Sequence, residues 1–380
     1  MAVPSLAALS RLVERYNTSV VFSTATQPAF THLDKSVSKY SSAGWKTREI
    51  VPQDIRLFER ARRTKVSWEI ETPTTWNTLA DSIAQDECRK CLCILNVKKH
   101  AIRLIEILKE NNIEGIFHLS TSLCPAHRES VLKEVRARLG EDDHRPCRLI
   151  STQCVEAGVD VDFPVVYRAF GPLDAIAQAA GRCNRNGRNP ENGEVRVFIP
   201  EPKPNGRISY PGETYRQAAE ITKIILTATR TGEADIYNNA LFDRYYKTFY
   251  DLTGATDILE ELEDAFQRRD FRDAAAYYRL IENDSVNVLV PYEDKTYKEL
   301  RDRMREERKL TREWIQKATP YSVSLFRPKQ RDAVWNYLEP VYVNERERSD
   351  EWFIYLEKKH YDDLLGLIPP EGPEAWMVYD

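Results

Sequence analysis

The sequence predicts an α/β fold in which a parallel sheet carries helices on both faces. Between residues 90 and 200, short apolar runs alternate with segments in which apolar residues recur at helical spacing. Each run is apolar at successive positions, as expected of a strand that is covered on both sides. Strands that alternate with helices in this way form parallel sheets. After residue 206 the pattern is mostly helical, which predicts a smaller, mainly helical C-terminal domain.

The expected strands are short and follow one another closely. They cover residues 92–97, 115–119, 147–151, 165–169 and 195–199. A helix should follow the second strand, because Pro125 suits a first helical turn and Gly140 suits a C-terminal cap. Another short helix is expected at 173–181. One more predicted strand, at 19–23, lies far upstream, and we expect it to join this sheet or to belong to a domain that is missing.

Downstream of the sheet, four helices are expected from their apolar spacing. They cover residues 213–230, 256–267, 271–282 and 296–318. The last helix would carry a basic stripe that could follow a DNA strand, formed by Arg301, Arg305, Arg308 and Arg312. Glutamates interleave with these arginines, so the alternative is a solvated helix held by salt bridges. We expect the tryptophans of this region to lie in a core rather than to stack on bases.

Composition limits the class of protein. The chain has 380 residues, 42% of them hydrophobic and 30% charged, which suits two or three folded domains and excludes wholesale disorder. No apolar run approaches the roughly 20 residues of a membrane span, and the N-terminus lacks the pattern of a secretory signal. We therefore expect a cytoplasmic protein with no membrane partner. The net charge of −4 means that any nucleic-acid surface has to be a local groove.

The cysteines do not predict a disulfide framework or a metal site. There are seven of them, an odd number, and Cys88 and Cys91 form a single CxxC pair. A structural zinc site needs four ligands, and no second pair follows at a suitable spacing. Cys93 falls within a predicted strand. We expect reduced thiols and no bound metal at these positions.

Polar blocks follow the predicted strands. In an open parallel sheet, ligands bind at the carboxyl ends of the strands, so these blocks are candidate binding segments. In one block Arg182 and Arg185 lie three residues apart and would share a helical face. Two guanidinium groups on one face suit a polyphosphate whose charge grows during phosphoryl transfer. The alternative is a solvated helix that carries surface arginines.

A second block follows the strand at 147–151. Hydroxyl groups at a strand end, such as that of Thr152, can donate hydrogen bonds to nucleic-acid phosphates without carrying charge. Gly158 and Asp160 could turn the chain so that a carboxylate meets a ribose hydroxyl or a backbone amide. The alternative for this segment in isolation is a plain turn with a satisfied aspartate.

Taken in order, four polar blocks resemble motifs III, IV, V and VI of superfamily 2 helicases. The phrases VVFSTATQP, HLSTSLCPAHR and STQCVEAGVDVDFPVVYRAFGPLDAIAQAAGRCNRNG resemble, more narrowly, the CRISPR-associated helicase-nuclease of type I systems. The resemblance covers residues 15–200 and implies that the sheet is RecA-like. It implies that residues 1–45 are the tail of a first RecA-like domain with motif III, residues 46–205 the second RecA-like domain with motifs IV, V and VI, and residues 206–380 the C-terminal domain.

The resemblance implies a role for each matched residue. The residues that would couple nucleotide state to strand movement are Thr24, Ala25 and Thr26. Those that would hold the DNA backbone are Ser120, Thr121, Arg128 and Thr152. Those that would lie near the nucleotide are Gly158 and Asp160. The catalytic group would be Gln178, Arg182 and Arg185, whose arginines would act as fingers on the γ-phosphate of ATP bound by the first RecA-like domain.

Other motifs of this helicase class do not occur in the sequence. A phosphate loop needs a glycine directly before its lysine, and Gly44-Trp45-Lys46-Thr47 lacks it. Asp86-Glu87-Cys88-Arg89 imitates the acidic Mg²⁺ motif, but no apolar strand precedes it. The sequence contains no His-Asp dipeptide, which the metal-dependent nuclease domain requires. We therefore expect the C-terminal half of a helicase, without ATP hydrolysis of its own.

The resemblance also implies cofactors and partners. ATP and Mg²⁺ would be shared with the missing first RecA-like domain. The partners would be single-stranded DNA, a Cascade-type CRISPR effector complex, and a polypeptide that carries the first RecA-like domain and the HD nuclease. Two alternatives remain open: a superfamily 2 helicase fragment from restriction or repair, and a non-catalytic remnant that binds DNA or protein and regulates an interference complex.

Overall fold

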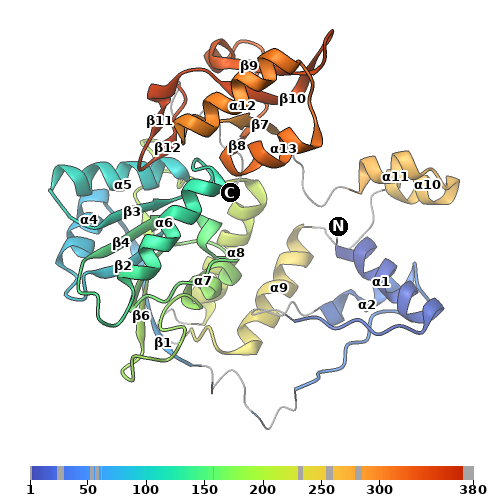
Figure 1. Ribbon diagram of the computed structural model, residues 1–380. Helices are drawn as coiled ribbons and strands as arrows, with labels where there is room; N and C mark the ends of the chain where they lie inside the picture. The colour runs from blue at the N-terminus through green and yellow to red at the C-terminus, as the bar shows by residue number, and fades with distance from the viewer. Residues whose placement is uncertain are drawn as a thin grey trace. The chain divides into compact units, whose positions relative to one another are not determined.

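The computed structural model describes residues 2–23, 30–51, 55, 60, 62–156, 158–229, 234–253, 260–278 and 285–370 (Figure 1). The chain forms two compact units. The first comprises Met1–Arg62, Gly171–Gln178 and Arg216–Glu282, and the second comprises Arg63–Phe170, Ala179–Tyr215 and Asn283–Asp380. No helix in the described ranges is long and apolar enough to cross a lipid bilayer.

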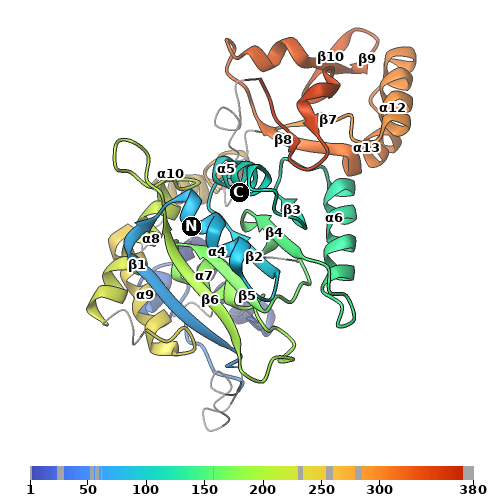
Figure 2. The same cartoon turned by 90° about the vertical axis from the view of Figure 1, so that its left-hand side faces the viewer.

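The second unit is built on a six-stranded sheet in which every pairing is parallel (Figure 2). The strand order is β1-β6-β5-β2-β4-β3. The strands are β1 (Thr64–Thr74), β2 (Lys90–Ile94), β3 (Ile116–Leu119), β4 (Cys147–Ser151), β5 (Val165–Ala169) and β6 (Gly193–Pro200). All five strands predicted between 90 and 200 are confirmed. The edge strand β1 was not predicted.

Both faces of this sheet are covered. Along β2, Cys91 and Cys93 point to one face and Leu92 and Ile94 to the other, and all four side chains are fully buried. The first face packs against α4 (Trp76–Gln85) and α5 (Lys98–Glu110). The predicted parallel sheet with helices on both faces is therefore confirmed.

The helix α6 (Pro125–Arg138) lies beside the edge strand β3 (Figure 2). Pro125 occupies its first turn, as predicted. The helix ends with Leu139 as its cap residue, so Gly140 follows the cap instead of forming it, and its backbone is not left-handed.

A second, mixed sheet follows in the same unit. Its order is β8-β7-β10-β9, built from β7 (Ser285–Leu289), β8 (Ser322–Phe326), β9 (Leu338–Asn344) and β10 (Glu347–Tyr355). The helices α12 (Asp294–Glu307) and α13 (Arg312–Ala318) pack on one face, where Trp314 and Trp352 are buried as expected of core tryptophans. The prediction for this region was a mainly helical C-terminal domain. The helices are present, but the four-stranded sheet was not predicted.

The helix predicted at 296–318 is two helices. Arg308 takes a left-handed backbone with φ 46°, which ends α12, and the hydroxyl of Thr311 then accepts from Trp314 N at 3.1 Å and starts α13. The predicted basic stripe is therefore broken. Arg301 pairs with Asp302, and Arg305 with Glu339, so the salt-bridged alternative holds for these two.

The described part of the first unit is helical. It contains α1 (Ala2–Tyr16), α2 (Asp34–Ser38), α9 (Asn239–Thr253), α10 (Glu260–Arg268), α11 (Phe271–Tyr277) and most of α8 (Glu213–Ala228). The strand predicted at 19–23 is wrong. Val21 is 67% and Phe22 43% exposed there, and no described strand pairs with this run. An apolar run without a partner strand cannot satisfy its backbone groups in a sheet.

A small hairpin joins the two sheets of the second unit. It consists of β11 (Tyr361–Asp362) and β12 (Gly366–Leu367). Leu367 N donates to Ser122 O at 2.9 Å, and a side chain on Gly366, whose φ is 75°, would lie 2.3 Å from that same oxygen. The hairpin therefore holds the segment that connects β3 to α6.

Candidate functional site

Ser120 follows β3 directly, and its hydroxyl is fully engaged inside the protein. The side chain is 0% exposed, and its Oγ lies 2.8 Å from His118 Nε2 and 3.2 Å from Ser122 N. Burial lowers the pKa of His118 to about 4. Its Nδ1 faces the carbonyl of Ile150, which can only accept, so Nδ1 carries the proton and Nε2 accepts from Ser120. Ser120 therefore donates to His118 and accepts from Ser122.

Thr152 follows β4 and lies next to the end of β3. Its backbone N donates to Leu119 O at 3.1 Å, its side chain is 0% exposed, and its hydroxyl bonds Cys154 Sγ at 3.6 Å. Thr121 and Arg128, by contrast, are half-buried. The structure brings the predicted DNA-binding residues to the carboxyl ends of β3 and β4 and the start of α6, where Thr121 and Arg128 remain reachable.

The motif V and motif VI segments meet on the second unit. Arg182 Nε donates to Val155 O at 3.0 Å, and its Nη2 donates to Glu156 O at 2.5 Å. Arg185 Nε lies 3.4 Å from Asp160 Oδ1, and this pair is exposed. Two arginines and one of the residues predicted near the nucleotide are thus gathered in one place.

The local geometry of the two arginines differs from the prediction. The helix α7 (Leu173–Ala180) ends before Arg182, so Arg182 and Arg185 lie in turns and share no helical face. The backbone that carries them starts near the amino end of β5, while the Arg182 side chain reaches the loop that follows β4. Phe163 and Cys183 form a bridge just before β5 begins, because α7 carries the chain back toward the amino ends.

The turn that carries Arg185 is fixed by two side chains that the sequence analysis missed. Asp162 accepts from Arg185 N at 2.7 Å and from Asn186 N at 3.0 Å. Asn184, 4% exposed and with φ 45°, donates to Arg63 O at 3.0 Å and Asn189 O at 2.9 Å. Asn184 suits a left-handed position, because short polar side chains tolerate it. The neighbouring Asn-Gly dipeptide is the turn pattern that could have indicated this loop.

The two arginines differ in electrostatic surroundings. Burial, and secondly the positive charge of Arg185, lower the pKa of Arg182 from its ordinary value. Arg185 is 41% exposed, and its carboxylate partner Asp160 is 80% exposed. Ion pairs between exposed groups are weak and exchange readily. Arg185 is therefore the arginine with the more accessible guanidinium group.

A buried charge that the sequence analysis also missed lies beneath this site. Arg168, on β5, is fully buried and pairs with Glu156, Nη2 to Oε1, at 3.0 Å. The signal was present, because Arg168 is the one charged residue in the apolar strand 165–169. A charge in a buried strand requires a partner.

The remaining predicted residues are placed as follows. Gly158 has φ 71° and is exposed, with open space where a side chain would begin. Gln178 lies half-buried on α7 and belongs to the first unit. Thr24, Ala25 and Thr26 lie outside the described residues. Within the described ranges, no group of three or more His, Cys, Asp or Glu side chains is placed to hold a metal ion.

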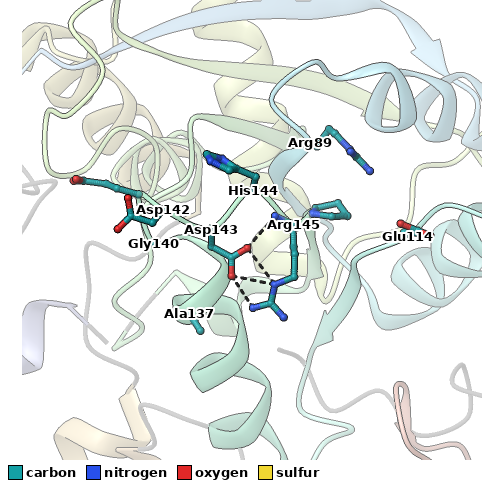
Figure 3. A pocket seen from close by; sticks show the side chains of 10 residues that line it. Arg89, Glu114, Ala137, Gly140, Asp142, Asp143, His144 and Arg145 are labelled. Atoms are coloured by element: carbon teal, nitrogen blue, oxygen red, sulfur yellow. Dashed lines mark hydrogen bonds and ion pairs between the residues drawn. The ribbon is translucent and has the colours of Figure 1, made fainter.

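A hollow on the second unit lies apart from this site. It is an open depression of about 840 Å³ lined by charged residues, among them Arg89, Glu114, Asp143 and Arg145 (Figure 3). Arg89 immediately precedes β2, so the hollow lies at the amino ends of the strands, opposite Ser120 and Thr152. Its Asp143 and Arg145 neutralise each other at 2.6 Å. It contains none of the predicted site residues.

Known proteins resemble this chain in the same region. Residues 87–188 match the family described as the C-terminal region of the CRISPR-associated nuclease/helicase Cas3. The Cas3 of Haloferax volcanii is 55% identical over 56 residues, 14% of this chain and 6% of that protein. The Cas3 of Methanothermobacter thermautotrophicus is 24% identical over 289 residues, 76% of this chain and 30% of that protein. The chain thus spans less than a third of the length of these relatives.

Solved structures share the fold. The crystal structure of T. fusca Cas3 superposes with a TM-score of 0.50 at 14% identity, covering 84% of this chain and 40% of that one. Another, of a CRISPR-associated protein, gives 0.52 at 14% identity and covers 85% and 42%. These likenesses support the RecA-like architecture of the six-stranded sheet. Residues 87–188, which contain the segments that resemble motifs IV, V and VI, are thus similar to the C-terminal region of Cas3.

Proposed function

We propose that this chain supplies the second RecA-like domain of an ATP-dependent single-stranded DNA translocase that acts in type I CRISPR interference. The loop between β4 and β5, which we call the motif V loop, carries Thr152, Gly158 and Asp160. The observation that carries the proposal is that Arg182 and Arg185 contact this loop, on a segment that matches the Cas3 family. Residues 1–45 would be the tail of the first RecA-like domain, and Thr24–Thr26 would couple nucleotide state to movement.

The nucleotide would lie between this domain and the first RecA-like domain, which would carry the Walker motifs. T. fusca Cas3 has been solved in forms described as Cas3-ATP and Cas3-ADP, which supports ATP as the cofactor. Arg185 would exchange its exposed partner Asp160 for the γ-phosphate and stabilise the charge that develops in the transition state. Gln178 and Gly158 would lie near the nucleotide. Mg²⁺ would be held by the phosphates and by the partner's acidic motif.

DNA would be held by its backbone at the carboxyl ends of β3 and β4. Arg128 is half-buried and makes no ion pair with a described residue, so it would contribute a charged phosphate contact. Thr121 would contribute a second, uncharged contact. The hydroxyls of Ser120 and Thr152 are engaged internally, so these two residues would fix the strand ends beneath the DNA.

The remaining partners follow from the family. A polypeptide with the first RecA-like domain and the HD nuclease would complete the enzyme, and a Cascade-type effector complex would deliver the DNA. The Cas3 match favours this function over a restriction or repair helicase.

The test is reconstitution. The isolated chain should not hydrolyse ATP with or without single-stranded DNA, because it has no phosphate loop or acidic motif to bind the phosphates with Mg²⁺. Adding a first RecA-like domain, in trans or by fusion, should produce DNA-stimulated hydrolysis. In that enzyme Arg185→Ala and Arg182→Ala should each lower turnover by about 10³–10⁵, as expected for arginine fingers. Lysine at either position should restore little, because it lacks the guanidinium fork.

Arg188→Ala is the matched control. Arg188 lies in the same loop but pairs with Glu141 at the surface, so its loss should change turnover by less than about tenfold. Near-native hydrolysis in both finger variants would reject the proposed role of motif VI. DNA-stimulated hydrolysis by the isolated chain, lost in Arg182→Ala, would reject the need for a partner.

A further inference from the structure

The buried ion pair of Arg168 and Glu156 lies directly beneath the motif V loop. The Arg168 side chain is 0% and the Glu156 side chain 7% exposed, and Nη2 lies 3.0 Å from Oε1. Arg168 projects from β5, while Glu156 belongs to the segment between Thr152 and Gly158. The pair therefore connects the central sheet to the loop that follows β4.

Besides this ion pair, the Arg168 guanidinium group donates three hydrogen bonds. Its Nη1 donates to Asn96 Oδ1 at 2.8 Å and to Ala169 O at 2.7 Å, and its Nη2 donates to Tyr215 OH at 2.7 Å. Asn96 in turn donates to Phe170 O at 2.8 Å. These contacts join the carboxyl ends of β2 and β5, so the guanidinium group has one position.

The motif V loop is attached to this network at more than one point. Gln153 Nε2 donates to Asn96 O at 3.2 Å, and the Glu156 carboxylate meets Arg168. On the other side, the carbonyl groups of Val155 and Glu156 accept from Arg182 at 3.0 and 2.5 Å. Glu156 is thus bound through its side chain to the sheet and through its carbonyl to Arg182.

Stability alone does not explain a charged pair in this position. Taking two charges out of water is costly, and well-packed apolar residues of similar size often serve stability equally well. A polar network differs from an apolar contact in that its hydrogen bonds are directional and favour one arrangement of the bonded groups. Within the described residues Arg168 Nε donates no hydrogen bond, and Glu156 Oε1 meets Arg168 as an ion pair, so the pair is held by the groups around it. Arg168 and Glu156 are therefore suited to hold the loop that follows β4 in one conformation against β5.

We propose that Glu156 and Arg168 are positioning residues that hold the motif V loop, and through its carbonyl groups Arg182, in one geometry. This inference rests on the proposed function, because the loop and Arg182 belong to the proposed nucleotide site. Neither residue would touch ATP or DNA. Their effect would be to hold Arg182 and Asp160 in the positions from which they face the nucleotide bound by the partner domain.

The experiment measures amide hydrogen exchange of the full chain by mass spectrometry, without nucleotide or DNA. The amides of Glu156, Phe163 and Asn184 report on the loop, because they donate to Gln153 O, Arg182 O and Phe163 O. Three variants are compared with the native chain: Glu156→Gln, Arg168→Met, and the double variant Glu156→Leu with Arg168→Met. The single variants leave one buried group unpaired, whereas the double variant replaces the pair with apolar side chains.

The positioning role predicts that exchange rises at least about tenfold in the loop peptides of the double variant, even where its melting temperature returns toward the native value. Native exchange in a double variant that recovers stability would overturn the proposal, because the pair would then serve packing only. Should the single variants fail to fold, the double variant still decides. Glu194→Gln, which removes a half-buried ion pair with Arg196 on the same sheet, is the control and should leave the loop unchanged.

The exchange measurement separates this inference from the proposed function. Amide exchange in the motif V loop of the isolated chain does not depend on ATP hydrolysis. The proposed role of Arg182 and Arg185 as arginine fingers can therefore be rejected while the positioning role of Glu156 and Arg168 is supported. In the reconstituted ATPase, Glu156→Gln should lower kcat about tenfold or more with little change in KM, since transition-state contacts would be lost. A rise in KM alone would overturn the link to Arg182.

Discussion

Among single residues of the proposed DNA-binding segment, His118 has a pKa far below the ordinary value for histidine. It is buried between Ile150 O and Ser120 Oγ, and its imidazole is neutral at pH 7 because burial lowers its pKa to about 4. Protonation would place a donor against the Ser120 hydroxyl, which would then have to turn. The Ser120 hydroxyl can therefore donate to His118 Nε2 only as long as the imidazole stays neutral.

Lowering the pH should consequently destabilise the fold through this histidine. The folded-state pKa, about 4, lies below the ordinary value of 6.5, so the unfolded chain binds the proton more tightly. The stability is fully present above pH 6.5 and is lost as pH falls toward 4, with about 2 kcal/mol lost between pH 7 and pH 5. Urea denaturation of the native chain and of His118→Gln at both pH values tests this. An equal loss in both proteins would show that another group is responsible.

At the level of elements, the central sheet was predictable and its surroundings were not. Strands 147–151 and 165–169 are confirmed to the residue, because they are apolar on both faces. The edge strand β1 was missed because the prediction relied on runs that are apolar at successive positions. Val66, Trp68 and Ile70 alternate with polar residues instead, which is the pattern of a half-buried edge strand. The break at Arg308 was missed because no glycine or proline marks it.

The same limit applies to the candidate site. Arg182 and Arg185 were found through a resemblance, but their placement depends on Asp162 and Asn184, whose roles appear only once the loop is folded. The predicted shared helical face assumed that α7 continues past Ala180, and sequence periodicity does not locate helix ends that closely. Long-range partners such as Glu156 and Arg168 are not encoded in local spacing.

The β11–β12 hairpin gives a prediction at this scale. Gly366→Ala should destabilise the second unit by about 1–3 kcal/mol, because the residue is left-handed and the new methyl group would collide with Ser122 O. The midpoint of urea unfolding measures the loss. Gly206→Ala is a matched control, since Gly206 is also left-handed, at φ 76°, but has open space around it, so it isolates the backbone strain from the collision. Equal losses in the two variants would contradict the proposed contact.

At the scale of the whole molecule, charge decides how the protein meets DNA. The net charge of −4 offers no general attraction, so binding of single-stranded DNA should be weak, independent of sequence and strongly salt-dependent. Arg128→Ala should lower affinity at every sequence and reduce the slope of log affinity against log salt by about one. Fluorescence anisotropy over a salt series measures both quantities.

The control for this prediction is Lys133→Ala, which removes the same charge from an exposed position further along α6. Its effect should be clearly smaller than that of Arg128→Ala. If the two variants lose the same affinity, the loss reflects the change in net charge, and Arg128 makes no specific phosphate contact. If the isolated chain binds no DNA at low salt, the binding surface requires the first RecA-like domain.

The hairpin contact also bears on how this protein can be shortened. Tyr361 Oη lies 3.3 Å from Cys124 N and 3.0 Å from His127 Nδ1, so residues near position 360 complete the first turn of α6. Removing residues 285–370, with the C-terminal sheet, would leave that turn without these partners and would expose Cys124, which packs in the core of that sheet. Limited proteolysis of the folded chain should therefore leave residues 285–370 uncut. A shortened protein that ends at residue 205 should be prone to aggregate, because the apolar residues that this region covers would be exposed.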